Sequence, residues 1–70
     1  PGYETVMFEL KEWVEAGRFE LYNNTGQLTA SAHFAGDQFK FERRNLTAGV
    51  YHFQITSNSR LVATGKIILH

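Results

Sequence analysis

The sequence predicts an all-β fold, a small antiparallel β-sandwich of the immunoglobulin-like type with about six to seven strands. Hydrophobic residues recur at every second position in several short segments, which is the period of a strand with one buried face. Short polar or glycine-containing stretches typical of turns separate these segments. The only proline is Pro1, so no interior strand is excluded on that ground. We expect a single domain spanning residues 1–70.

The first expected strand covers residues 3–10, in which hydrophobic side chains alternate onto one face. The next segment, residues 9–17, is ambiguous because Leu10, Trp13 and Val14 fall at helical spacing. A helix of two turns is marginal without strong packing, so we expect an irregular connection there.

The middle of the chain predicts three further short strands. Residues 19–22 and 28–34 alternate in hydrophobicity and are joined by a polar turn at 23–26. A second turn signal, Ala-Gly-Asp at residues 35–37, precedes a short strand at 39–42 whose lysine and glutamate face water.

The last third of the sequence predicts a β-hairpin. A turn containing Gly49 leads into strict alternation over residues 51–56. A polar break of hairpin length follows at 57–60, and residues 61–69 return as the second strand. Within that strand, Gly65 predicts a bulge or a close backbone approach.

Short blocks of this sequence resemble a known family. Residues 46–51 read Leu-Thr-Ala-Gly-Val-Tyr, and residues 64–68 read Thr-Gly-Lys-Ile-Ile. Upstream, the block Glu-Ala-Gly at residues 15–17 precedes the blocks Phe-Glu-Leu-Tyr-Asn at 19–23 and Gly-Gln at 26–27. In this order and spacing, the blocks are similar to the C-terminal sorting domain of bacterial type IX secretion cargo.

Two departures from that family pattern lie in turns. Ser59 stands where the family usually has the glycine of the last hairpin, so Asn58-Ser59 is a poorer match to a tight primed turn. The turn at residues 23–25, Asn-Asn-Thr, is more polar than the common version. Both departures concern turn geometry rather than the fold.

The resemblance implies a folded secretion signal that directs a cargo protein across the outer membrane and is then removed or exchanged for a surface anchor. The implied partners are the outer-membrane secretion machinery and a sortase-like peptidase. The implied localisation is the periplasm in transit, followed by the cell surface or the extracellular space. The glycines of the terminal blocks would shape the backbone, the tyrosine and isoleucine would anchor the hairpin, and the lysine would be exposed for recognition. The residues concerned are Gly49, Val50, Tyr51, Gly65, Lys66 and Ile67.

Charge and composition exclude several other classes of protein. Seven basic and seven acidic residues cancel, whereas nucleic-acid binders usually carry a basic surplus, so we expect no nucleic-acid partner. No apolar run approaches the roughly 20 residues of a membrane-spanning helix. The absence of cysteine leaves a domain of this size to be stabilised by burial alone, so contact with a second copy would be unsurprising.

The residues that carry chemistry are dispersed. His33, His52 and His70 fall on separate expected strands without a ligand-spaced partner. The serines lack a nucleophile motif, and the glycines are scattered at turns rather than gathered in a phosphate-binding loop. We therefore expect no enzyme activity, no metal and no cofactor.

Other interpretations remain open from the sequence. A carbohydrate-binding or adhesive β-sandwich appended to a secreted enzyme would present Trp13, Tyr3 and Tyr22 as an exposed platform, although aromatics that close the open end of a small core are the favoured explanation. A passive spacer module is the third interpretation. The basic residues of the second half are a docking surface for an acidic partner or ordinary solvated charges; these are Arg43, Arg44, Arg60 and Lys66.

Overall fold

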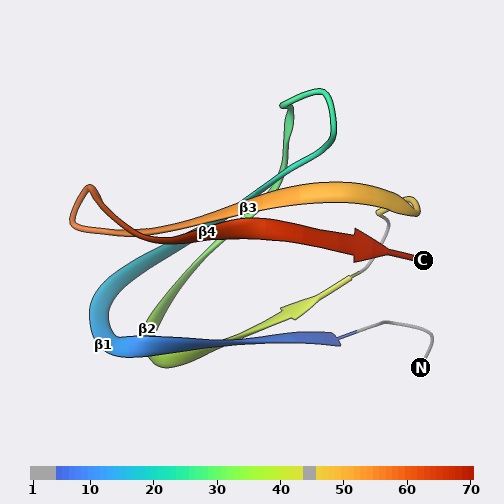
Figure 1. Cartoon of the computed structure of the whole chain (residues 1–70). Helices are drawn as coiled ribbons and strands as arrows, with labels where there is room; N and C mark the ends of the chain where they lie inside the picture. Colours follow the sequence, from blue (N-terminus) through green and yellow to red (C-terminus); the bar gives the residue numbers. More distant parts are fainter. Residues whose placement is uncertain (1–4, 44–45) are drawn as a thin grey trace.

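Four antiparallel strands form one open sheet in the computed structural model, which describes residues 5–43 and 46–70 (Figure 1). Their order across the sheet is β2-β1-β3-β4, so β1 is central and β4 lies at one edge. The strands are β1 (Thr5–Tyr22), β2 (Leu28–Glu42), β3 (Gly49–Ser57) and β4 (Arg60–Leu69). The part of the chain that the structure describes holds no helix long and apolar enough to cross a membrane.

The all-β class is confirmed, but the predicted sandwich of six to seven strands is wrong. Residues 9–17, expected as an irregular connection, are part of the continuous strand β1. The Ala-Gly-Asp segment at 35–37, expected as a turn, lies inside β2. Each interruption bends a strand without ending it, so four expected strands merge into two long ones.

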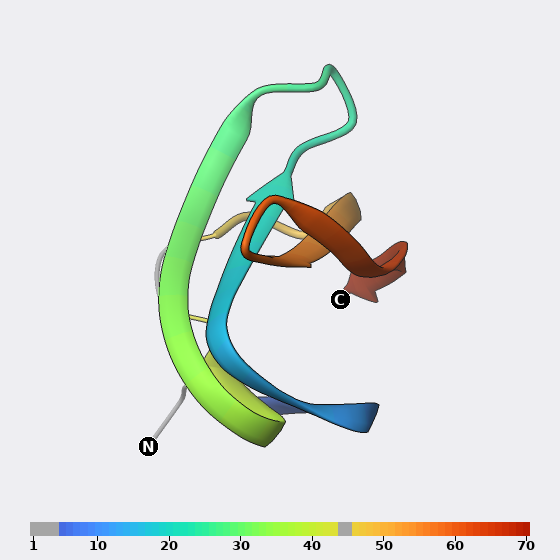
Figure 2. The ribbon, with the colours of Figure 1, turned by 90° about the vertical axis from the view of Figure 1, so that its left-hand side faces the viewer.

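Irregular pairing produces the bend. From Glu9 to Val14 the chain advances five positions along β1, while the partner residues advance only two, from Gln38 to Gly36. Gly36 has a φ of 110°, a conformation that residues with a Cβ rarely adopt, and the ring of Trp13 lies over it. Extra residues of this kind are bulges, which bend a strand and keep it in the sheet. As Figure 2 shows, β1 and β2 curve so strongly that their two halves form separate layers.

A cluster of phenylalanines fills the space between these layers. Phe19 is fully buried, and its ring centroid lies 4.7 Å from that of Phe39 and 5.3 Å from that of Phe41. Phe8, from the other half of β1, lies 5.2 Å from Phe19 and 4.8 Å from Phe53. The tilted and edge-on geometries are those that aromatic pairs prefer. The bend thus lets a single sheet bury a core between two of its own parts.

The turn between β3 and β4 is tighter than its sequence indicates. Ser57 pairs with Arg60, leaving a two-residue loop in which Asn58 and Ser59 have φ values of 52° and 66°. Positive φ at both positions is the geometry of a primed hairpin turn. Asparagine tolerates it well, whereas serine adopts it at a cost. The serine therefore leaves the turn type intact and makes it less stable.

Replacing Phe19 tests the core. We expect Phe19→Ala to lower the free energy of unfolding by about 3–5 kcal/mol, because it removes the ring that the other phenylalanines contact. This loss is about as large as the whole stability of a domain of this size, so the variant should be largely unfolded. Thermal unfolding followed by circular dichroism measures the effect. Met7→Ala is the control, since Met7 is half exposed and should change stability by less than about 0.5 kcal/mol.

The strain at Ser59 gives a second prediction. Ser59→Gly should raise the free energy of unfolding by about 0.5–1 kcal/mol, because glycine adopts positive φ without steric cost. Ser59→Ala retains a Cβ and should bring no such gain. Equal stability of the glycine and alanine variants in urea unfolding would contradict the turn assignment.

Candidate functional site

The hairpin of β3 and β4 carries all six residues that the sequence indicated for recognition. Because β4 pairs with β3 alone among the described strands, one side of its backbone is open (Figure 1). The register pairs Gly49 with Leu69, Tyr51 with Ile67 and Phe53 with Gly65. Alternation along the strands then divides the six residues between two faces, called here the inner face, toward the core, and the outer face.

Four of the six residues lie on the inner face: Gly49, Tyr51, Gly65 and Ile67. Tyr51 is buried and Ile67, its cross-strand partner, packs against the core cluster. Gly65 lies beneath the ring of Phe53, where a Cβ would come within 2.7 Å of ring carbon. The expected close approach at Gly65 is therefore made by an aromatic ring, and the register shift of this hairpin lies elsewhere, between Ile55 and Thr56. Glycine lets the ring of Phe53 cover the edge strand.

Tyr51 also fixes the connection that precedes β3. Its hydroxyl donates a hydrogen bond of 2.8 Å to the backbone oxygen of Thr47. The buried phenol thereby finds an acceptor, which a polar group inside a protein requires. Gly49, between the two, has a φ of 152° and pairs with the buried Leu69. Residues 47–51 thus form a compact entry into the hairpin.

The outer face of the hairpin presents Lys66 and an apolar pair. Lys66 is exposed and lies in a cross-strand row with His52 and Tyr22. Next to this row, the half-buried Val50 pairs with Ile68, which is 56% exposed. The sequence analysis did not predict the exposure of Ile68. A local signal for it exists, because Ile68 follows the inward-facing Ile67 in β4 and therefore points to the outer face. The surface formed by Val50, Lys66 and Ile68 is called here the outer patch.

The surroundings of this row shift the pKa of its tyrosine. Desolvation raises the pKa of the Tyr22 phenol above its ordinary value, and the charge of Glu20 and a hydrogen bond to it act in the same direction. Arg18, which forms an ion pair of 3.2 Å with Glu20, opposes this shift.

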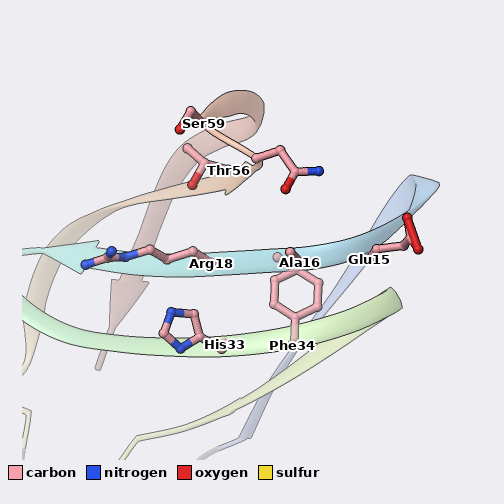
Figure 3. A pocket seen from close by; sticks show the side chains of 9 residues that line it. Glu15, Ala16, Arg18, His33, Phe34, Thr56 and Ser59 are labelled. Atoms are coloured by element: carbon pink, nitrogen blue, oxygen red, sulfur yellow. The ribbon is translucent and has the colours of Figure 1, made fainter.

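A hollow in the surface lies near the bend of β1, away from the outer patch. It has a volume of about 590 Å³, and Figure 3 shows Arg18 and His33 on neighbouring strands at its wall, with the ring of Phe34 directed toward β1. Its side chains come from several chemical classes and converge on no common point. Across residues 5–43 and 46–70, no group of three or more histidine, aspartate or glutamate side chains could hold a metal ion.

The aromatic platform of the carbohydrate interpretation is not assembled among the described residues. Trp13 is 70% exposed, but it lies at the bend of β1, whereas Tyr22 ends that strand. Tyr3 and Arg44 lie outside the described residues. Arg60, another candidate for docking, forms an ion pair of 2.8 Å with Glu12.

A groove separates β4 from the first half of β1. Its volume is about 430 Å³, and it is lined by residues 9–12 of β1 together with Val62 and Ala63 of β4. The Arg60–Glu12 ion pair joins β4 to β1 near it. The open edge of β4 is therefore accessible beside a partly apolar groove.

Removing the Tyr51 hydroxyl tests the entry into the hairpin. Tyr51→Phe should lower the free energy of unfolding by about 1 kcal/mol, because the oxygen of Thr47 loses its buried donor. Thr47→Val is the matched control, since it keeps the backbone oxygen that accepts the 2.8 Å bond and removes only the longer contact of 3.4 Å between the Thr47 hydroxyl and the Tyr51 hydroxyl. Urea unfolding of both variants measures the difference, and an equal loss in the two would contradict the assigned bond.

Comparison with known proteins gives one finding. No curated protein and no solved structure matches the chain. One family model, described as the secretion system C-terminal sorting domain, matches residues 1–70, which is the whole sequence. The chain belongs to this family and is a C-terminal sorting domain for type IX secretion of cargo proteins, a signal rather than a catalyst.

Proposed function

We propose that the outer-membrane part of the secretion machinery recognises this domain through the outer patch and the open edge of β4. In this proposal, residues 1–70 act as one domain that folds in the periplasm together with its cargo. A sortase-like peptidase then removes the domain as the cargo is anchored at the cell surface or released. Family membership supports an interaction with secretion machinery in general.

The observation that carries the proposal is the position of Lys66. It is exposed on an edge strand, and no ion pair engages it within the described part of the chain. Ile68 and Val50 add an apolar contact area beside it. A partner that fits this surface places a carboxylate next to apolar side chains, because charge complementarity selects partners and apolar burial adds affinity.

The open edge of β4 offers a second means of recognition. A strand from the receptor can pair with the free backbone groups of β4, a mode in which main-chain hydrogen bonds supply affinity and alternate side chains supply specificity. The outer patch lies on this same strand and its neighbour, so an added strand would bring receptor side chains beside Lys66 and Ile68. Both contacts can therefore be made by one segment of the receptor.

The remaining predicted residues shape this surface from within. Tyr51 and Ile67 join the hairpin to the core, and Gly65 admits the Phe53 ring. Gly49 allows the chain to enter β3 next to Leu69. In this proposal these four residues do not touch the receptor, and they hold in place those that do.

Reversing one charge tests the proposal. Residues 1–70 are fused behind a reporter that reaches the periplasm of a bacterium with a type IX system, and the reporter is measured outside the cell. Lys66→Glu should reduce export at least about tenfold, the consequence of losing roughly 1.4 kcal/mol of binding free energy. Lys40→Glu is the matched control, because Lys40 is an exposed strand lysine on β2, away from the hairpin.

Folding must be checked beside export. Both variants should unfold at the same temperature as the parent, since each changes an exposed side chain. Deletion of residues 64–70 removes more than half of β4 (Arg60–Leu69) and should abolish export. Unchanged export of Lys66→Glu would overturn the role of the outer patch, and unchanged export of the deletion would overturn the role of the hairpin as a whole.

A further inference from the structure

Arg43 holds three separate parts of the chain together. It directly follows β2 and is half buried. Its Nε donates a hydrogen bond of 3.1 Å to the backbone oxygen of Leu46, in the connection that leads to β3. One of its terminal nitrogens donates a second bond of 2.6 Å to the backbone oxygen of His70, directly after β4. One guanidinium thereby links the ends of β2 and β4 and the entry to β3.

From this geometry we infer that Arg43 is a positioning residue for the recognition of β4, an inference that rests on the proposed function. The last residues of an edge strand open easily, because their hydrogen bonds are few and one side faces water. Arg43 opposes this opening at the end of β4 from which the outer patch projects. The fixed position of the Ile68 and Lys66 side chains on the molecular surface thus depends on Arg43, a residue far from both in the sequence.

Arginine suits this position better than lysine. Its planar group presents several N–H donors in a fixed fork, so it can donate to two oxygens on different segments at once. A lysine ammonium is a compact point charge on a flexible stem and loses more order for each bond. Hydrogen bonds from a charged donor are also stronger than those between neutral groups. Retaining the charge alone should therefore not retain the function.

A neighbouring contact strengthens the inference. The hydroxyl of Tyr51 binds the oxygen of Thr47, next in the chain to the oxygen that Arg43 binds at Leu46. The connection is thus held by a tyrosine of β3 and by Arg43, and Arg43 also extends the link to His70. A role as a docking cation for an acidic partner fits Arg43 less well, because two of its nitrogens donate to the protein's own backbone.

The experiment separates the effect of Arg43 on the local order of β4 from its effect on the stability of the whole domain. Arg43→Gln and Arg43→Lys are made in the export fusion, each alone and together with Ser59→Gly, which is expected to restore stability. Hydrogen exchange of the protected amides in residues 67–69 should accelerate about tenfold or more in Arg43→Gln, since the loss of a charge-assisted bond is of that order. Export should fall at least about fivefold and should stay low in the double variant even when its unfolding temperature equals that of the parent. Arg43→Lys should lie between Arg43→Gln and the parent.

Arg60→Gln is the matched control. It removes the same charge from the opposite end of the hairpin, where Arg60 binds the exposed Glu12, and it should leave exchange in 67–69 and export unchanged. Unchanged exchange in Arg43→Gln would overturn the clamp. Recovery of export in the stabilised double variant, with exchange still fast, would overturn its positioning role. A failure of Lys66→Glu to reduce export would count against the proposed recognition surface, while the exchange measurement would still decide whether Arg43 orders β4.

Discussion

The burial of Phe19 between two parts of one sheet is the constraint on which the rest of this structure depends. Its ring contacts Phe8, Phe39 and Phe41 from the opposite half of the bent hairpin of β1 and β2, and Phe53 from β3. A flat sheet of four strands would leave this face in water. A domain of 70 residues without cysteine cannot form a disulfide, so its stability depends strongly on such burial. The bulges near Val14 and the turn-like Gly36 are therefore as necessary to the core as the aromatic rings themselves.

Alternation in the sequence predicted the class of fold and the two faces of the final hairpin, and it did so for a physical reason. Side chains of a strand point to opposite faces in turn, so the burial of Tyr51 and the exposure of Lys66 can both be derived from a local pattern. The bends could not be derived in the same way. Glycine and a break in alternation look alike whether a strand ends in a turn or continues through a bulge, and only the pairing of Val14 with Gly36 distinguishes the two.

Several features of the site were not specified by the sequence because they depend on contacts between distant segments. The open edge of β4 follows from the strand order, which no local pattern specifies. The link from Arg43 to His70 requires that the end of β2 and the end of β4 meet in space. The ring over Gly65 requires the register of β3 and β4. By contrast, the family was correctly identified from a few short blocks in β1, the turn after it and the final hairpin, because such blocks are local sequence patterns.

The central position of β1 has a consequence for how the domain is made. This strand comes first in the described chain, yet one side of its second half is paired by β3, and β3 is in turn covered by β4. Contacts between such distant segments form slowly, and here they require the last residues to be present. A polypeptide whose synthesis stopped before β3 would leave Phe19 and Leu21 without the strand that encloses them. The domain can therefore complete its core only after β3 and β4 have been synthesised.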